Sequence, residues 1–458
     1  MTQAIPQHPL QVAVIGSGPS GFYAAEALLR ADRAVQVTML ERLPVPFGLV
    51  RSGVAPDHPK LKEVIRVYQR IAQHPDFHFC GNVQFGQDIQ LAELRQHYHA
   101  VILACGAETD RSLDIPGEAL TGSHTATEFV GWYNGHPDYR DCQFDLSQEV
   151  AVVIGQGNVA ADVCRILLKP VDALRRTDIA GHALDALAAS RIREVHLIGR
   201  RGPAQAKFSA KELRELGEIE QCAVQVNADE LQLNPASQLE LAAKTNDNSV
   251  KNLNLLQTFS EQTSVTGQQR RLFIHFLLTP LRLEGDSRLQ RAVFARNRLQ
   301  GDPFAQTAVA TDTCFSLDCG LLFRSIGYRA RPLPDIPFAH RRGVIPNQAG
   351  RVLESDKKIV PGLYVCGWIK RGANGIIGTN RADSLETVSA LLEDSGRLDT
   401  GVKTGQQGLL NQLAARKTAI ITFADWQRID QAEITRGAQY DKPREKFTRI
   451  DEMLACLI

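Results

Sequence analysis

A short glycine-rich stretch near the N-terminus restricts the possible folds of this chain more than any other feature. Residues 12–15 are apolar and run directly into the three glycines of a G-x-G-x-x-G pattern, Gly16, Gly18 and Gly21. An Ala- and Leu-rich segment follows from 22 to 29. This order is typical of a buried strand that turns directly into a helix, and it predicts a dinucleotide-binding α/β unit.

The chemistry of this turn suits a diphosphate. Gly16 makes the tight turn, Gly18 lets the backbone approach the phosphates, and Gly21 allows close packing of helix on strand. The diphosphate is expected at the helix N-terminus, where N–H groups and the helix dipole favour negative charge. A second strand, 35–40, ends at Glu41, about 20 residues beyond the last glycine, where an acid that binds ribose hydroxyls belongs. Glu41 would repel a 2′-phosphate.

A second unit of the same kind begins at residue 149. The apolar strand 149–154 runs into Gly155-Gln156-Gly157-Asn158-Val159-Ala160, a G-x-G-x-x-A turn, and a helix is expected to end near Leu168. The next strand, 194–198, ends in Gly199-Arg200-Arg201 rather than in an acid. Arginines at this strand end accommodate the 2′-phosphate of NADP through charge and fork geometry. The alternative is a solvated basic strand end.

The composition limits the class of protein. A chain of 458 residues predicts two or three cores. The formal charge of +1 gives no global electrostatic reason for binding nucleic acid or a membrane. Residues 1–10 lack the pattern of an export signal, and no apolar run approaches the roughly 18–20 residues of a spanning helix. Nine cysteines without a C-x-x-C pair favour reduced thiols in a cytoplasmic protein and give no metal site.

The remaining segments suggest how the chain is organised. The long Pro- and Gly-rich loop 44–59 is expected to be functional. Ser209 and Glu212 have the spacing of a helix capping box. Residues 297–302 are expected to form a surface loop, and 317–326 a strand that returns to the first domain. The glycine-rich segment 370–380 leads into a helix and can offer N–H donors to a carbonyl-rich ring edge.

Three motifs together resemble the adrenodoxin-reductase-type ferredoxin–NADP reductases, most closely the bacterial members. They are P-x-G-L-V-R-S-G-V-A-P-D-H-P at 46–59, G-R-R-G-P-x-Q at 199–205 and G-W-I-K-R-G at 367–372. The resemblance extends from Gly16 to about Trp426. It implies an α/β fold of two doubly wound, Rossmann-like nucleotide-binding domains, with the NADP domain inserted into a split FAD domain. The expected parts are 1–108 and 327–458 for FAD and 109–326 for NADP.

The resemblance also implies the residues of both cofactor sites. For FAD it implies diphosphate and ribose contacts at Gly16, Ser17, Gly18, Pro19, Gly21 and Glu41, flanking residues Leu49 and Val83, and isoalloxazine contacts at Trp368, Gly375, Ile376, Ile377 and Gly378. For NADP(H) it implies Gln156, Gly157, Asn158 and Val159 at the diphosphate, Arg200 and Arg201 at the 2′-phosphate, and Glu212 in the same pocket. His58 and Glu215 match positions proposed to assist catalysis near the nicotinamide; a purely structural role remains open for both.

The activity that the resemblance implies is ferredoxin–NADP⁺ reductase. A hydride would pass between NADPH and FAD, and single electrons would pass to or from a ferredoxin or similar small acidic carrier. Steering of that carrier is expected from basic residues near the cleft, Lys207, Lys211, Arg214, Lys370 and Arg371. A monomer or weak dimer is expected.

Other functions stay open at this point. They are an NADPH-dependent diaphorase, an electron-feeding subunit for another acceptor, and a non-enzymatic NADP-responsive binding protein. A disulfide reductase would need the missing C-x-x-C pair.

Overall fold

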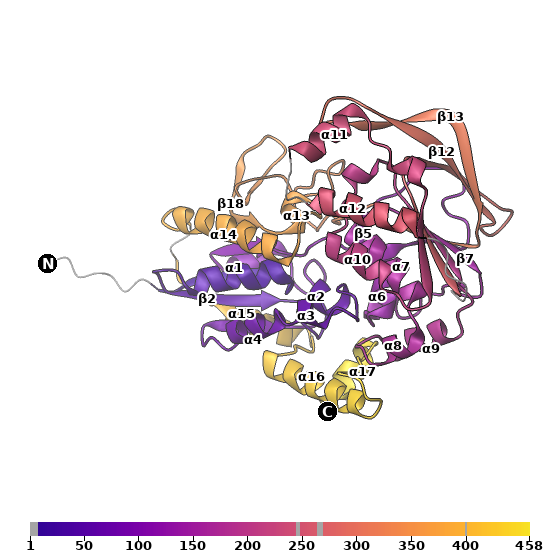
Figure 1. The fold of residues 1–458 in the computed structure, drawn as a ribbon. Coiled ribbons are helices and arrows are strands. Elements are labelled where there is room, and N and C mark those ends of the chain that lie inside the picture. The colour runs from indigo at the N-terminus through magenta and orange to yellow at the C-terminus, as the bar shows by residue number, and fades with distance from the viewer. Residues whose placement is uncertain (1–7, 244–247, 263–268, 399–400) are drawn as a thin grey trace. The chain divides into compact units, whose positions relative to one another are not determined.

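The computed structural model describes residues 8–243, 248–262, 269–398 and 401–458. The chain forms two compact units, one made of residues 1–109 and 328–458 and the other of residues 110–327 (Figure 1). Each unit contains its own sheet with helices packed against it; the sheet of the first unit is mixed, and that of the second is all-parallel. In the part of the chain that is described, no helix is both long enough and apolar enough to span a membrane.

The first unit is built on a seven-stranded sheet in the order β16-β17-β18-β4-β1-β2-β3. Strand β1 (Leu10–Ile15) lies between β2 and β4, parallel to both, and all six of its residues are buried. Such uninterrupted burial is typical of a parallel strand covered on both faces. The other strands are β2 (Val35–Leu40), β3 (Phe77–Cys80), β4 (Ala100–Leu103), β16 (Asn347–Gln348), β17 (Arg351–Leu353) and β18 (Ile359–Val365).

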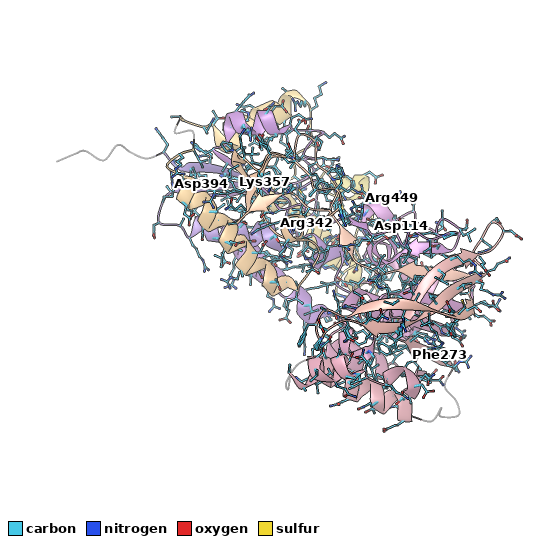
Figure 2. The ribbon with its side chains drawn as sticks, turned by 90° about the horizontal axis from the view of Figure 1, so that it is seen from above. Asp114, Phe273, Arg342, Lys357, Asp394 and Arg449 are labelled. Carbon is cyan, nitrogen blue, oxygen red and sulfur yellow. The ribbon has the colours of Figure 1, made fainter. Side chains whose placement is uncertain are left out.

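Helices α1 and α14 join the two segments of the first unit. The Ser20 hydroxyl on α1 (Pro19–Leu29) donates to Asn380 Oδ1 at 3.2 Å, and the Ser384 hydroxyl on α14 (Ile377–Asp394) donates to the Ser20 carbonyl at 2.9 Å. Asp394, labelled in Figure 2, ends α14 and accepts from the Tyr364 hydroxyl of β18 at 3.0 Å. The remaining helices are α2 (Leu49–Ser52), α3 (Pro59–Lys62), α4 (Ile65–Ala72), α5 (Leu91–His97), α13 (Trp368–Arg371), α15 (Gly405–Ala415), α16 (Phe423–Ala438) and α17 (Ile450–Ala455).

A buried ion pair holds the long loop 44–59 against the C-terminal helices. Arg51 in α2 donates to both carboxylate oxygens of Glu433 in α16, at 2.9 and 2.5 Å. Arg51 is 8% exposed and Glu433 is completely buried. The Arg51 guanidinium also lies 5.1 Å from the ring centroid of Trp426. The loop therefore depends on a helix almost 400 residues further along the chain.

The second unit has a six-stranded, all-parallel sheet in the order β6-β14-β7-β8-β10-β9. On β10, Phe273 (labelled in Figure 2) stacks on His196 of β8 with ring centroids 4.8 Å apart. Its strands are β6 (Ser123–Thr125), β7 (Val150–Ile154), β8 (Glu194–Ile198), β9 (Cys222–Val226), β10 (Arg270–His275) and β14 (Leu321–Arg324). Its helices are α6 (Ala126–Tyr133), α7 (Asn158–Leu168), α8 (Val171–Arg175), α9 (Gly181–Ala188), α10 (Ala210–Gly217), α11 (Pro235–Ala242) and α12 (Asn248–Glu261). A two-stranded pair, β5 (Thr109–Asp110) and β15 (Tyr328–Arg329), accompanies the chain crossings.

Two expectations for the second unit are wrong. Residues 297–300 belong to strand β12 (Arg291–Gln300), which pairs with β11 (Leu278–Glu284) and β13 (Thr307–Asp318) in an antiparallel sheet. Arg298 and Gln300 lie on the exposed face of this strand, whereas Asn297 is buried. The expected strand 317–326 is divided between the end of β13 and β14, and β14 pairs with β7 of the second unit.

We expect the buried Arg51–Glu433 pair to stabilise the first unit strongly. Replacing Glu433 with Ala leaves the Arg51 guanidinium buried without its carboxylate, which should lower the free energy of unfolding by about 3–5 kcal/mol. Arg428→Ala is the matched control on α16, because its ion pair with Asp425 is more than half exposed on the arginine side; we expect it to cost less than about 1 kcal/mol. Urea unfolding followed by tryptophan fluorescence measures both. Equal small losses would show that the pair does not hold the loop.

Candidate functional site

The first glycine turn follows β1 and has the geometry that its sequence predicts. Gly16 has a φ of +107°, and a Cβ there would lie 2.6 Å from the Ala104 carbonyl oxygen. A Cβ at Gly21 would lie 2.1 Å from the Gly16 carbonyl oxygen. At Gly18, by contrast, an added Cβ would meet no heavy atom within 4 Å. Close packing therefore requires two glycines, and the third faces open space.

The N-terminus of α1 points into that open space. No side chain caps the helix, and Pro19 occupies its first turn. The backbone N–H groups of the first turn and the positive end of the helix dipole are therefore available to an anion. A diphosphate fits this environment.

Glu41 lies beside the same turn at the end of β2. Its Oε2 accepts from the Ser17 backbone N–H at 3.1 Å and from the Ser17 hydroxyl at 2.6 Å, and its Oε1 accepts from the Leu43 N–H at 3.1 Å. The acid thus helps to hold the turn, a structural task that the sequence spacing did not reveal. A carboxylate has about four acceptor positions, so ribose hydroxyls can still bind it.

The two expected flanking residues lie close to this turn. Val83 is buried and its N–H donates to the Glu41 carbonyl at 2.9 Å. Leu49 begins α2 directly after Gly48, where an added Cβ would lie 3.0 Å from the Cα of Gly18. The structure therefore brings loop 44–59 over the glycine turn.

The segment after β18 forms a second part of the site in the first unit. The Gly367 N–H donates to Asp383 Oδ2 at 2.5 Å, and Asp383 was not identified from the sequence. The next residue, Trp368, has its ring centroid 5.4 Å from that of Tyr328. Its Nε1 is buried and has no hydrogen-bond partner among the described residues. This orphaned donor suits a ligand with a carbonyl or a ring nitrogen.

The N-terminus of α14 offers further donors. Gly375 has a φ of +83°, and an added Cβ at Gly378 would meet no heavy atom within 4 Å. Ile376 precedes the helix and is 71% exposed, and Ile377 is its first residue. An open helix N-terminus beside an exposed apolar side chain fits a flat ring with a polar edge.

The second glycine turn repeats the build of the first. Gly155 has a φ of +134°, and a Cβ there would lie 2.1 Å from the Ser325 carbonyl oxygen. Gly157 again faces space without heavy atoms within 4 Å of an added Cβ. It precedes α7, whose N-terminus has no side-chain cap. The second unit therefore has its own open anion site.

Side chains around this turn hold the neighbouring segments. Gln156 Nε2 donates to the His275 carbonyl at 2.9 Å, and the Lys207 N–H donates to the Gln156 carbonyl at 2.8 Å. Asn158 Oδ1 accepts from the Ser209 N–H at 2.8 Å. At the start of α7, where Val159 lies, backbone N–H groups rather than these side chains are left for phosphate oxygens.

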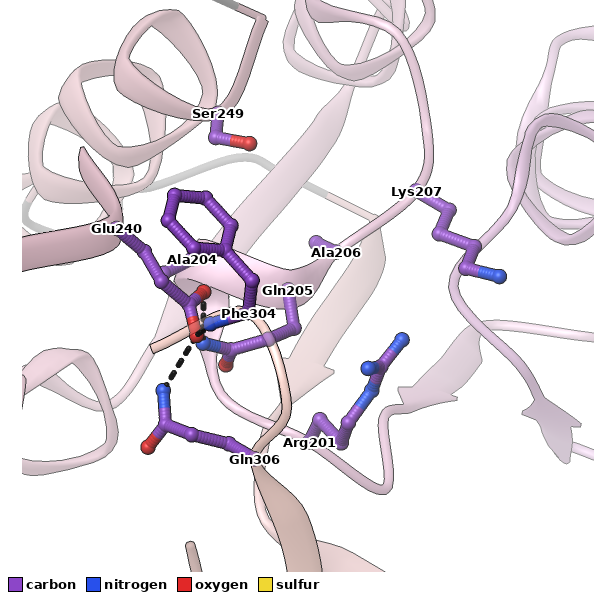
Figure 3. Close-up of a pocket in the computed structure, with 9 residues that line it drawn as sticks. All are labelled: Arg201, Ala204, Gln205, Ala206, Lys207, Glu240, Ser249, Phe304 and Gln306. Carbon is purple, nitrogen blue, oxygen red and sulfur yellow. Dashed lines mark hydrogen bonds between the residues drawn. The ribbon is translucent and has the colours of Figure 1, made fainter. Parts of the chain in front are cut away.

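Three cations close to this turn lack carboxylate partners. Arg200, Arg201 and Lys207 have no ion pair within the described ranges of the chain. The Arg200 carbonyl accepts from Asn297 Nδ2 at 2.8 Å, so the structure fixes the backbone while the guanidinium is exposed. Arg201 and Lys207 line a pocket of about 230 Å³ (Figure 3). Clustered cations that pair with no described carboxylate fit a phosphate dianion.

Glu212 is placed differently from the capping box that the sequence predicts with Ser209, and Glu215 lies near it on α10. The Ser209 hydroxyl does accept from the Glu212 N–H at 3.2 Å and caps α10. The Glu212 carboxylate, however, accepts from Arg165 at 3.0 Å instead of returning to the cap, and Glu215 lies 3.9 Å from the same arginine. Because Arg165 is only 2% exposed, these acids balance a buried charge in the second unit.

His58 belongs to the first unit and precedes α3. Its N–H donates to the Ala55 carbonyl at 3.0 Å, and its side chain is buried. Glu215, the other candidate catalytic residue, belongs to the second unit.

The cysteines near the first site are unsuited to redox chemistry. All nine cysteines are free thiols. Burial raises the pKa of Cys366, next to Gly367, to about 12. The same cause raises the pKa of Cys80, at the end of β3, to about 12. At neutral pH both remain protonated, so neither is a nucleophile.

Comparisons with known proteins agree with this arrangement. A family model described as pyridine nucleotide-disulphide oxidoreductase matches residues 10–226. NADPH:adrenodoxin oxidoreductase from Arabidopsis thaliana is 44% identical, over 98% of this chain and 95% of that protein. NADPH-ferredoxin reductase FprA from Mycobacterium leprae is 44% identical, over 98% of both chains.

A solved structure is also similar over nearly the whole length. It is that of Mycobacterium tuberculosis FprA in complex with NADPH, with a TM-score of 0.92, 42% identity and coverage of 98% of this chain and 100% of that chain. Identity and coverage at this level, together with two glycine turns of the same build, show that the chain belongs to the family of NADPH:adrenodoxin oxidoreductases and NADPH-ferredoxin reductases.

Proposed function

We propose that this protein is an FAD enzyme that transfers electrons between NADPH and a ferredoxin-type iron–sulfur protein. One observation carries the proposal: two glycine turns of the same build have opposite charge at the neighbouring strand end. Glu41 stands at the first, whereas Arg200, Arg201 and Lys207 at the second pair with no acid that the structure describes. The names of the relatives, which are NADPH-dependent reductases of ferredoxin or adrenodoxin, support the same function.

FAD is assigned to the first unit. Gly16, Ser17, Gly18 and the N-terminus of α1 would hold its diphosphate, and Glu41 its ribose. Trp368 and the N-terminus of α14 would contact the ring system. There the unpartnered Nε1 of Trp368 and the N–H groups of the helix N-terminus could donate hydrogen bonds to it. Bound there, FAD would supply a centre that takes up two electrons as a hydride and releases them singly, which nicotinamide cannot do.

NADP(H) is assigned to the second unit. Backbone N–H groups of the turn from Gln156 to Val159 would bind the diphosphate, and Arg200 and Arg201 the 2′-phosphate. Arg165, which lies beside both acids, would hold the side chains of Glu212 and Glu215 in place on α10. We keep His58 and Glu215 as candidate catalytic residues near the nicotinamide.

The chain itself has little covalent chemistry to perform. Asp383 holds the Gly367 turn, which orients Trp368, and the buried Arg51–Glu433 pair holds loop 44–59. The remaining tasks are to position the two ring systems and to exclude water from them. The protonated thiol of Cys366 takes no part.

The acceptor is proposed to be a ferredoxin or another small acidic carrier. Of the basic residues expected to steer it, Lys370 is wrongly chosen, because it is 6% exposed and its ammonium group lies 3.0 Å from Asp383. Arg371 is also largely covered and donates to Asn380 Oδ1 at 2.6 Å. Lys207, Lys211 and Arg214 are exposed and remain candidates.

A different electron acceptor is the main alternative, because no described residue specifies an iron–sulfur protein. A cytoplasmic monomer or weak dimer completes the proposal. Its nine free thiols agree with a reducing compartment.

Electron transfer can be tested directly. We expect the purified protein to be yellow, with one non-covalent FAD per chain. In stopped-flow measurements, NADPH should bleach the flavin absorbance, and mixing with oxidised ferredoxin should restore it. A folded preparation that takes up no FAD would overturn the proposal. Bleaching by NADPH without recovery in any ferredoxin would favour another acceptor.

Coenzyme choice should depend on the arginines that follow β8. Hydrogen bonds to charged groups contribute about 1.5–3 kcal/mol each. Arg200→Ala or Arg201→Ala should therefore weaken the binding of NADPH by about 10- to 150-fold and leave the binding of NADH nearly unchanged. KM for both coenzymes, with ferricyanide as acceptor, measures this. Arg282→Ala, which removes an exposed arginine of β11, is the control. Equal losses for NADH and NADPH would mean that the arginines support the fold instead.

Salt should slow the transfer to the carrier. If Lys207, Lys211 and Arg214 steer an acidic partner, cytochrome reduction through ferredoxin should fall as ionic strength passes about 0.1 M, where the Debye length is about 10 Å. Ferricyanide reduction in the same salt series corrects for effects on NADPH binding. A constant ratio of the two rates would show that these charges only solvate the surface.

A further inference from the structure

Phe304 is an exposed aromatic residue held in an unfavourable backbone conformation. It lies in the connection between β12 and β13, where its side chain is 62% exposed. Its φ of +66° is in the left-handed region, which residues with a bulky side chain rarely adopt. Such backbone strain persists only where the surrounding structure imposes it, and it concentrates at ligand sites.

A buried carboxylate imposes this conformation. Glu240 on α11 is buried, and its Oε1 accepts from the Phe304 N–H at 2.7 Å. The same carboxylate accepts from Gln306 Nε2 at 2.8 Å and from Gln205 Nε2 at 2.9 Å. The Glu240 carboxylate therefore joins the backbone of Phe304 to two other segments of the second unit.

The Phe304 ring borders the pocket that the unpaired cations also line. The pocket measures about 230 Å³, and Figure 3 shows the ring on one side of it, with Arg201 and Lys207 extending toward each other on another. The Lys207 N–H binds the Gln156 carbonyl at 2.8 Å, so the pocket adjoins the second glycine turn. A flat apolar surface, two cations and an adjacent diphosphate turn thus occur together.

We propose that Phe304 is the platform on which the adenine of NADP(H) stacks, and that Lys207 joins Arg200 and Arg201 at the 2′-phosphate. This inference rests on the proposed function and extends it by naming a residue that contributes to coenzyme affinity. Stacking on an aromatic ring uses the face of the base and makes no hydrogen bond to its edge. The platform should therefore favour a purine without reading its substituents, while the cations recognise the phosphate.

The test separates the base from the phosphates. Calorimetry with adenosine 2′,5′-bisphosphate needs neither flavin reduction nor turnover. Phe304→Ala should weaken its binding by about 5- to 150-fold. Inorganic pyrophosphate has no base. Its affinity, measured by competition against the bisphosphate, should be unchanged in this variant. Arg201→Ala should weaken binding of the bisphosphate, because it removes a cation from the 2′-phosphate.

Further variants separate stacking from folding. Phe304→Gly removes the ring and relieves the left-handed strain, so it should fold at least as well as the parent protein and still lose affinity. Phe304→Tyr keeps a flat ring and should retain affinity. Leu239→Ala removes another exposed apolar side chain of the same unit, 60% exposed on α11, and should change nothing.

Two results would overturn the platform. One is unchanged affinity for the bisphosphate in Phe304→Gly; the other is an equal loss for bisphosphate and pyrophosphate. Either can occur in a protein that oxidises NADPH normally, in which case the proposed function stands. A wild-type protein that neither binds the bisphosphate nor oxidises NADPH would overturn the proposed function as well.

Discussion

The structure depends on close backbone packing at two strand–glycine–helix turns. At Gly16 and Gly155 an added Cβ would collide with a carbonyl oxygen of a neighbouring segment, at 2.6 and 2.1 Å. This closeness brings the N-termini of α1 and α7 to the carboxyl ends of the parallel strands. Neither helix N-terminus has a side-chain cap. The N–H groups at each helix N-terminus then favour an anion, so the packing that builds each unit also leaves a place where an anion can bind.

Charge at the next strand end distinguishes the two sites. Glu41 is already bound to Ser17, so the first site keeps a negative charge that opposes a 2′-phosphate. In the second site Arg200 and Arg201 have no acid partner within the described residues, and their charge is available to a ligand. In our proposal this short-range electrostatic difference assigns FAD to the first unit and NADP(H) to the second.

Contacts between distant segments complete the first site. Ser20 binds Asn380 and Ser384, and Arg51 binds Glu433, across sequence separations of 360 residues or more. A buried ion pair contributes little by itself, but losing one partner leaves a charge without compensation. Loop 44–59 is therefore tied to helix α16 of the C-terminal segment.

The sequence by itself determined the two glycine turns, the helices and strands beside them, and the charges at Glu41, Arg200 and Arg201. These follow from local periodicity and from the steric requirements of a tight turn. It did not determine that residues 297–300 form a strand, or that Glu212 turns from its helix cap to Arg165.

Only the tertiary structure decided these points, and it also decided that Lys370 is buried beside Asp383 and that Glu240 holds Phe304 in a left-handed conformation. In each case a polar side chain satisfies a partner far away in the sequence. The free energy of an unpaired buried charge or polar group, rather than any local preference, selects the arrangement.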